Sequence, residues 1–449
     1  MAKQSAHFNC SNCGYRPPKW VGCCPECSQW GSITELKPSF ASKDFKTSHK
    51  ETNLTPLYKV NVHAQQRMLS GIHEWDRVVG GGVMPGSFLI LTGDPGIGKS
   101  TLLLQIVNAL AAQFSVLYFS SEESLEQVRL RAERLDCLHE NLRCSDQSQL
   151  ESIIATAEEE MPHIIIIDSI QNCYSADSQV IPGSIGQLRE AGFRLMRLAK
   201  EKNIAVILTG HITKEGTIAG PKMLEHMVDA VFYLQGEDRW QTRILRSVKN
   251  RFGALGELGF FQMDEKGLQQ VPDINQHLLS EATFSPGSAL ISSVEGSRPF
   301  LLELQALLVP SKFGMPQRIV SGIDPKQVAL IAAIIEKYLH IKLSTHDIFF
   351  KVSGGFKIKD NAADLGIALA LLSSYFQQPL PEKSIALGEL SLTGQIKPIN
   401  QIGIHLREAE KFGIKKMLLA SNQKLEKKTA SIHSFKSVYQ LLELFNNEQ

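Results

Sequence analysis

The chain has 449 residues, which is enough for about three domains of ~150 residues each. Hydrophobic residues make up 43% of it and charged residues 21%, a balance typical of globular domains that excludes a wholly disordered, collagen-like or coiled-coil chain. Since 47 basic residues are balanced by 46 acidic ones, a generally basic nucleic-acid-binding protein is also excluded. Any contact with nucleic acid must come from a local patch.

The N-terminus lacks the features of a secretory signal peptide. Residues 1–9 have no apolar core, and a cysteine cluster follows at once. The most apolar stretches, residues 163–168 and 328–335, are far shorter than the ~18 apolar residues that span a membrane. We therefore expect a cytoplasmic protein without membrane association.

Five of the eight cysteines lie in the first 27 residues. Two C-x-x-C pairs, Cys10 with Cys13 and Cys24 with Cys27, are separated by ten residues. Each pair makes a tight turn that directs two thiolates at one ion, so the two pairs predict a four-thiolate Zn²⁺ site. Cys23 would fit only with a longer second turn. The alternative, a pair of disulfides, belongs to an oxidising compartment.

The predicted zinc module covers residues 1–36, and its metal would hold it folded. We expect Trp20 and Trp30 to pack around it. Residues 37–60 are rich in Ser, Thr and Lys without sustained periodicity, which predicts a flexible linker. Three later cysteines stand in apolar segments and are expected to be buried: Cys137, Cys144 and Cys173.

A nucleotide-binding loop follows the linker. The apolar run 88–92 predicts a buried strand, and it leads into G-D-P-G-I-G-K-S-T, which matches the P-loop pattern G-x-x-x-x-G-K-[ST]. An apolar-periodic helix is expected over residues 102–112. In such a loop backbone N–H groups surround phosphates, the lysine reaches the β- and γ-phosphates, and the next hydroxyl binds Mg²⁺. The predicted nucleotide and magnesium residues are Gly93, Asp94, Pro95, Gly96, Ile97, Gly98, Lys99, Ser100 and Thr101.

Carboxylates follow two further apolar strands. The strand 163–168 ends at Asp168, the expected position of a Walker-B carboxylate beside the metal. The strand 115–121 is followed by Glu122 and Glu123, one of which could orient the attacking water. The alternative is a pair of solvated acids in the first turn of a helix, where the helix dipole favours them.

Strands and helices continue to alternate. Strands are expected at residues 204–211 and 229–234, and a helix at 186–202. This alternation predicts a doubly wound α/β fold with a parallel sheet and with ligands at the carboxyl ends of the strands. His211 ends one of these strands near the expected γ-phosphate, and the alternative is a structural histidine.

Together these stretches resemble a known family. The RecA-type ATPase core is represented by W-D-R-V-V-G-G-G-V-M-P-G before the P-loop, by the P-loop itself, by S-S-E-E-S and by I-I-I-D-S-I-Q. With the four-cysteine module and K-N-R-F-G at residues 249–253, nearly the whole chain resembles the RadA (Sms) family of bacterial DNA repair proteins. Ser121 stands where that family usually has glycine.

The resemblance implies a DNA-dependent ATPase of homologous recombination with ATP, Mg²⁺ and Zn²⁺ as cofactors. Such a protein binds single-stranded DNA and promotes branch migration or processing of branched recombination intermediates together with RecA. It also implies self-association into a ring, commonly a hexamer. The alternatives are an ATP-dependent Lon-like protease, and an ATP-gated DNA clamp or adaptor without motor activity.

The resemblance also assigns roles within the predicted ATPase domain, residues 61–275. Glu122 and Glu123 occupy the position of the RecA-type catalytic glutamate, and we favour Glu123. His211 begins H-I-T-K-E-G-T-I-A-G-P-K, which resembles the family's DNA-facing loop. We expect His211 to sense the γ-phosphate and the loop lysines, Lys214 and Lys222, to contact the DNA backbone.

The stretch K-N-R-F-G is a signature of the same family. Lys249 and Arg251 alternate on a strand-like segment, so both side chains could point to one side. In a ring they could reach the ATP of the neighbouring subunit and stabilise phosphate charge. A DNA-backbone contact and a solvated basic edge are the alternatives.

A second α/β pattern begins near residue 276, with strands at 289–294 and 300–308 and a helix at 324–339. Two later segments, residues 359–373 and 387–399, resemble the proteolytic domain of Lon proteases, in which a Ser–Lys pair carries out the chemistry.

The matching positions lack that pair. Asp364 occupies the position of the nucleophile, and Gly403 and His405 lie near that of the lysine. A carboxylate cannot form the usual acyl-enzyme, so residues 276–449 are expected to be a proteolytically inactive scaffold. Four lysines are candidates for a duplex-DNA surface, with a solvated basic face as the alternative: Lys342, Lys351, Lys357 and Lys359.

Overall fold

The structure is a computed structural model that describes residues 7–15, 17–36, 56–59, 66–176, 184–211, 221–237, 242–271, 273–312, 316–425 and 431–445. The chain forms two compact units, Met1–Val271 and Pro272–Gln449. Within the described ranges no helix combines the length and the apolar character that crossing a membrane requires.

The N-terminal module is a small antiparallel pair of strands, β1 (His7–Cys10) and β2 (Ile33–Leu36). Its buried core consists of Cys10, Cys24 and Ile33. Both tryptophans lie beside Gly22, where a Cβ atom would be 3.9 Å from Trp20 and 3.7 Å from Trp30. They nevertheless remain at the surface, because Trp20 is 62% exposed and Trp30 is 80% exposed.

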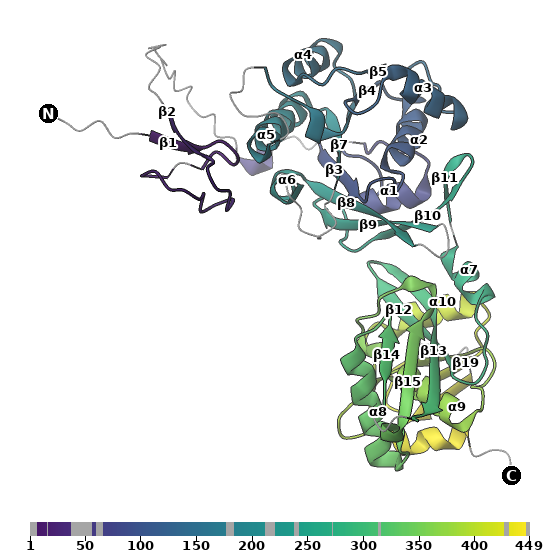
Figure 1. Cartoon of the computed structure of the whole chain (residues 1–449). Helices are drawn as coiled ribbons and strands as arrows, with labels where there is room; N and C mark the ends of the chain where they lie inside the picture. Colours follow the sequence, from purple (N-terminus) through teal and green to yellow (C-terminus); the bar gives the residue numbers. More distant parts are fainter. Residues whose placement is uncertain are drawn as a thin grey trace. The chain divides into compact units, whose positions relative to one another are not determined.

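A nine-stranded sheet forms the centre of the first unit, in the order β11-β10-β9-β8-β3-β7-β6-β4-β5 (Figure 1). Its strands are β3 (Phe88–Gly93), β4 (Val116–Ser120), β5 (Leu142–Ser145), β6 (Ile164–Asp168), β7 (Ala205–His211), β8 (Ala230–Glu237), β9 (Thr242–Asn250), β10 (Leu258–Asp264) and β11 (Gly267–Gln270). The strands from β8 to β5 pair in parallel, which confirms the predicted α/β class. The sequence analysis did not predict β9, β10 and β11, which extend the sheet in antiparallel pairing.

Helices cover both faces of this sheet. They are α1 (His73–Val79), α2 (Lys99–Ala111), α3 (Leu125–Arg134), α4 (Leu150–Glu160), α5 (Ile185–Lys202) and α6 (Pro221–Met227). Side chains of α1, α2 and α3 join one hydrophobic core, and those of α4, α5 and α6 join the other. A strand covered on both faces must be apolar throughout, and residues 164–167 of β6 are four fully buried isoleucines.

The second unit is also α/β. One sheet has the order β12-β13-β15-β14, another has the parallel order β16-β19-β20, and β17 pairs with β18. The strands are β12 (Ser288–Glu295), β13 (Arg298–Pro310), β14 (Arg318–Ser321), β15 (His346–Val352), β16 (Ser384–Leu387), β17 (Glu389–Leu390), β18 (Ile396–Lys397), β19 (Lys416–Ala420) and β20 (Ser431–Phe435). The helices are α7 (Ile274–Ser280), α8 (Pro325–Leu339), α9 (Asp364–Phe376) and α10 (Ile402–Lys411).

Helix α9 forms the interior of this unit, and residues 364–374 are all buried. The helix approaches β12 so closely that a Cβ atom at Gly366 would lie 2.2 Å from Ile291 Cγ2. Any larger residue would therefore push the helix off the sheet.

Candidate nucleotide and metal sites

The P-loop connects β3 to α2 at the carboxyl edge of the parallel strands. Gly93 at the end of β3 lies opposite His211 of β7, and Ser120 of β4 lies opposite Asp168 of β6. Gly96 has a φ of 75° and Gly98 a φ of 110°, both in the left-handed region that glycine adopts without strain. A Cβ atom at Gly96 would have no neighbour within 4 Å, so no other part of the described chain crowds the loop backbone at this point.

Lys99, the first residue of α2, is held across this loop. Its side chain is 5% exposed, and Nζ donates hydrogen bonds to the carbonyl oxygens of Gly93 at 2.9 Å and Asp94 at 3.0 Å. Burial lowers the pKa of the ammonium group, whereas the nearby carboxylates of Asp168, Glu122 and Asp94 raise it. One buried cation therefore stands among the carboxylates that the sequence singled out.

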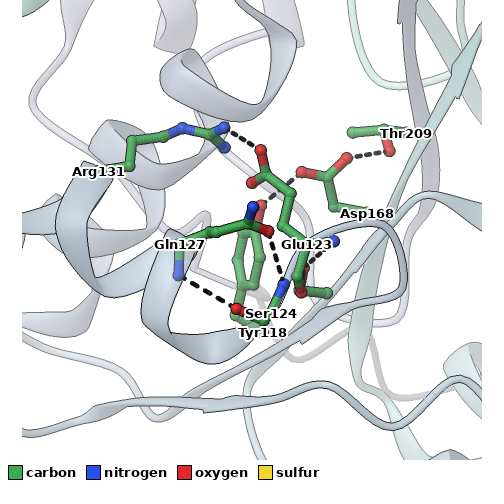
Figure 2. Close-up of polar contacts among 8 residues, drawn as sticks. Tyr118, Glu123, Ser124, Gln127, Arg131, Asp168 and Thr209 are labelled. Carbon is green, nitrogen blue, oxygen red and sulfur yellow. Dashed lines mark hydrogen bonds and ion pairs between the residues drawn. The ribbon is translucent and has the colours of Figure 1, made fainter.

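Asp168 is fixed by the strands on both sides of β6. Its Oδ2 accepts a hydrogen bond of 2.6 Å from the Tyr118 hydroxyl on β4, and its Oδ1 accepts one of 2.6 Å from Thr209 Oγ1 on β7 (Figure 2). Burial, followed by the neighbouring Asp168 charge, raises the pKa of Tyr118 well above its usual value. The phenol therefore remains a donor across the neutral pH range.

The two glutamates after β4 have different partners. Glu122 accepts a hydrogen bond from the hydroxyl of Ser169, the residue that follows Asp168. Glu123 instead forms an ion pair with Arg131 of α3, as Figure 2 shows. Its backbone oxygen also accepts a hydrogen bond of 2.8 Å from Ser120 Oγ. Of the two, Glu122 therefore contacts the side chain of the residue that directly follows the Walker-B strand β6.

A capping box begins α3 directly after the glutamates. Ser124 Oγ accepts a hydrogen bond from the Gln127 amide at 3.4 Å, and Gln127 Oε1 accepts one from the Ser124 amide at 3.1 Å. This reciprocal pair satisfies two amides at the helix terminus and fixes the direction of the chain that carries Glu122 and Glu123.

These residues fit a nucleoside triphosphate and Mg²⁺. The open loop provides backbone N–H groups for phosphates, Lys99 provides a cation, and Ser100 with Asp168 provides the oxygen ligands that Mg²⁺ prefers. Glu122 is exposed and Glu123 is half-buried, and each carboxylate also has a side-chain partner.

The sulfur atoms of Cys10, Cys13, Cys24 and Cys27 lie within 4.8 Å of one another. The Sγ atoms of Cys10 and Cys27 are 3.7 Å apart, and those of Cys13 and Cys24 are 3.5 Å apart. Tetrahedral Zn–S bonds of about 2.3 Å would place the sulfurs about 3.8 Å apart. The four thiols therefore fit Zn²⁺ and are not joined as disulfides. The fifth thiol, of Cys23, contacts the Cys24 carbonyl instead.

Among the other cysteines, Cys137 and Cys173 are buried as expected. The expectation for Cys144 is wrong, because this residue is exposed. It lies on β5, an edge strand that no helix fully covers.

The K-N-R-F-G residues contact the end of α6 within their own chain. Lys249 Nζ donates to the backbone oxygens of Glu225 at 2.5 Å and Val228 at 2.8 Å. Arg251 Nη1 lies 3.2 Å from Oδ1 of the buried Asp229, although the Arg251 side chain is 62% exposed. Burial lowers the pKa of Lys249.

The predicted sensor and DNA loop falls largely outside the described residues. The structure gives the backbone of His211 at the end of β7 and of Lys222 in α6, but it does not describe their side chains. Lys214 belongs to residues 212–220, which are not described.

In the second unit Asp364 is 7% exposed and begins α9. Gln327 Nε2 donates to its Oδ1 at 2.6 Å, and the Leu390 amide donates to its Oδ2 at 3.1 Å. His405 is equally buried, and its Nδ1 lies 2.9 Å from Ser292 Oγ. The four candidate lysines of this unit are exposed: Lys342, Lys351, Lys357 and Lys359.

Several residues of the nucleotide site were not identified from the sequence. Tyr118, Thr209 and Ser169 bind the carboxylates, and Arg131 holds Glu123. The sequence carries only a weak signal for them. Tyr118 and Thr209 are hydroxyl residues within apolar strands, at buried positions where an aliphatic residue would be expected.

Comparisons with known proteins agree with this architecture. A family model described as an AAA domain matches residues 66–217, one described as a rubredoxin metal binding domain matches 8–35, and one described as subunit ChlI of Mg-chelatase matches 321–423. Among solved structures, the RadB recombinase matches with a TM-score of 0.37 and 21% identity over 45% of this chain and 99% of that chain.

Curated relatives match along almost the whole chain. The DNA repair protein RadA of Bacillus subtilis is 41% identical over 426 residues, which cover 93% of each chain. That of Listeria monocytogenes is 42% identical, covering 94% of this chain and 93% of its own. That of Aquifex aeolicus is 39% identical over 99% of this chain and 100% of its own. The chain therefore belongs to the RadA family of DNA repair proteins.

Proposed function

We propose that this protein is a DNA-dependent ATPase of recombinational DNA repair. The observation that carries the proposal is that Lys99, Asp168 and Glu122 come together at the carboxyl edge of the parallel strands, beside a glycine-rich P-loop. Mg²⁺ bound there would neutralise phosphate charge. Lys99 would exchange its contacts with the Gly93 and Asp94 carbonyls for phosphate oxygens, and Asp168 and Ser100 would hold the metal.

We assign the role of orienting the attacking water to Glu122 and not to Glu123. Glu122 influences the charge of Lys99 and contacts Ser169, so it faces the nucleotide site. Glu123 is held by Arg131 on α3, so its carboxylate already has a cationic partner. This assignment reverses the preference drawn from the sequence.

The DNA substrate is proposed from the family. The relatives are named DNA repair proteins, and we propose that this chain binds single-stranded and branched DNA, acts with RecA and promotes branch migration as a ring, commonly of six subunits. His211 would sense the γ-phosphate, and Lys214 and Lys222 would contact the DNA backbone. The proposed domains are 1–36, a linker 37–60, the ATPase domain 61–275 and the scaffold 276–449.

Within such a ring we assign Arg251 to the nucleotide of the neighbouring subunit, because its guanidinium is largely exposed. Lys249 bonds two carbonyl oxygens of its own chain, so its first role is to secure the end of α6.

The alternative of an active Lon-like protease lacks a nucleophile. Asp364 stands at the matching position, and both of its oxygens accept hydrogen bonds inside the unit. We therefore propose that the second unit is a proteolytically inactive scaffold, with the four exposed lysines as a duplex-DNA surface. Casein cleavage that Asp364→Ala abolished would contradict this.

The test of the function compares ATP hydrolysis and strand displacement with and without single-stranded DNA. We expect added DNA to raise the rate in the wild type, and Lys99→Ala to abolish hydrolysis. Lys202→Ala serves as the matched control, because Lys202 pairs with Glu158 at the surface. The proposal would be refuted if added polynucleotide did not change the rate of ATP hydrolysis and nucleotide did not change DNA binding. DNA-stimulated hydrolysis without strand displacement would favour the clamp or adaptor.

A further inference from the structure

The Tyr118 hydroxyl is the least expected group near the P-loop. Tyr118 lies in the middle of β4, opposite Ile166 of β6, and is 2% exposed. A buried hydroxyl without a partner destabilises a fold by about 1–3 kcal/mol, whereas phenylalanine would fill the same space without a polar group. The hydroxyl donates to Asp168 Oδ2 at 2.6 Å.

The opposite side of the same carboxylate is held as well. Thr209 is fully buried on β7, and its Oγ1 donates to Asp168 Oδ1 at 2.6 Å. Two neutral donors on the two flanking strands therefore fix the rotation of the carboxylate about its Cβ–Cγ bond. Neutral donors leave the negative charge of the carboxylate in place, so it remains available to a cation.

A second layer supports the tyrosine. Figure 2 shows Glu123 between Arg131 of α3 and the Tyr118–Asp168 pair. Arg131 and Glu123 both act on the charge of the phenol, Arg131 lowering its pKa and Glu123 raising it, although burial and Asp168 act more strongly. The ion pair thus links the last turn of α3 to the surroundings of the Walker-B carboxylate.

We propose that Tyr118 is a positioning residue for the magnesium ion: with Thr209, its hydroxyl holds the Asp168 carboxylate in the orientation that binds Mg²⁺ beside the P-loop. The inference rests on the proposed function, since it assumes that Asp168 holds the metal. It assigns to Glu123 and Arg131 a supporting role behind Tyr118 in place of a role in catalysis.

The test measures binding of a fluorescent ATP analogue to the full-length protein as a function of Mg²⁺ concentration, and again in EDTA. We expect Tyr118→Phe to raise the half-saturating Mg²⁺ concentration about 5-fold and to leave binding in EDTA and the Tm of the free protein nearly unchanged. Thr209→Val should act in the same direction, and Thr209→Ser, which keeps the hydroxyl, should restore the wild-type value. Tyr338→Phe is the matched control, because the Tyr338 hydroxyl bonds the Leu392 carbonyl in the other unit.

An unchanged or lower half-saturating Mg²⁺ concentration in Tyr118→Phe would overturn the inference. Equal losses of binding with Mg²⁺ and in EDTA would also overturn it, because they would show a purely structural role. If the wild type itself bound the nucleotide without regard to Mg²⁺, the proposed function would fail and the inference with it. The first two outcomes would leave the proposed function standing.

Discussion

The adjacent carboxylates Glu122 and Glu123 show how one residue of register separates two roles. Both residues lie in the bend that follows the end of β4 at Ser120. Glu122 contacts the Ser169 hydroxyl next to Asp168, whereas Glu123 lies between Arg131 and the Tyr118–Asp168 pair (Figure 2).

We therefore expect Glu122→Gln to lower kcat for ATP hydrolysis by ~10²–10³-fold while nucleotide binding persists, because an amide cannot accept a proton from water. Glu123→Gln should lower kcat by less than about 5-fold, since its partly exposed ion pair contributes only ~0.5 kcal/mol to stability. Steady-state hydrolysis and binding of a fluorescent nucleotide give both quantities. The reverse order of the two variants would return the catalytic role to Glu123.

The motif residues of this site could be predicted, whereas their partners could not. Lys99 and Asp168 occur in patterns that local sequence specifies. Tyr118 and Thr209 meet Asp168 only through the register of three strands that are distant in the chain. No spacing within a single segment encodes that register, so these contacts became visible only in the folded structure.

Asp364 should make the stability of the second unit depend on pH. Burial is the main cause that raises the pKa of its carboxyl from 3.8 to about 6, and the charges of Glu389 and Asp360 add to it, although the hydrogen bonds from Gln327 and Leu390 oppose it. Because the pKa is higher in the folded state than in the unfolded state, protonation of Asp364 stabilises the fold. This stabilisation is complete below pH ~4 and is lost as the pH rises through about 6.

A shift of this size corresponds to up to ~3 kcal/mol. We expect wild type to lose stability relative to Asp364→Asn between pH 4.5 and about 7.5, as measured by calorimetry of the second unit's transition in the full chain. Asp347→Asn is the control, because Asp347 is half-buried at the start of β15. Parallel curves for wild type and Asp364→Asn would show that the carboxyl titrates normally.

At the scale of elements, the strands that are buried on both faces were predictable and the extension of the sheet was not. Once a P-loop has been located, the apolar runs that form β3 and β6 can be interpreted as parallel strands buried on both faces. In contrast, β10 and β11 are joined by a tight turn of charged residues and a glycine, and each is buried in its first residues and more exposed toward its end. Such short segments without a regular period carry little signal in a sequence that otherwise predicts parallel strands.

The β10–β11 hairpin supports the P-loop helix. A Cβ atom at Gly98 would lie 2.9 Å from Met263 Cε and 3.3 Å from Leu268 Cδ1, so both side chains pack against this glycine. Gln105 of α2 accepts a hydrogen bond of 2.9 Å from the Leu268 amide. The hairpin therefore fixes the first turn of α2 and with it the glycine that precedes Lys99.

We expect Leu268→Ala to destabilise the first unit by about 2–4 kcal/mol and to weaken nucleotide binding, because it leaves a cavity beside Gly98. Urea unfolding and binding of a fluorescent nucleotide measure the two effects. Leu130→Ala is the matched control, since Leu130 on α3 is 67% exposed. If Leu268→Ala lost stability but bound nucleotide as wild type does, the hairpin would support the fold and not the loop.

At the scale of the whole molecule, the proposed ring requires a residue that acts across subunits. Within its own chain the Arg251 guanidinium lies 3.2 Å from the buried Asp229 carboxylate, and the side chain is 62% exposed. The same carboxylate also pairs with Lys200 and accepts the Phe88 amide. Asp229 therefore remains satisfied if the guanidinium turns toward a neighbouring nucleotide.

We expect neither Arg251→Ala nor Lys99→Ala protein to hydrolyse ATP at more than a small fraction of the wild-type rate, and an equal mixture of the two to recover roughly one quarter of it. In randomly mixed rings about one interface in four joins an intact P-loop to an intact arginine. A mixture of Lys99→Ala with Asp168→Asn is the control, and it should recover nothing, because both changes affect the nucleotide site of the same subunit. If the Arg251→Ala mixture also stayed inactive while its subunits still assembled, Arg251 would act within its own chain, and the reason for a ring would have to come from DNA binding alone.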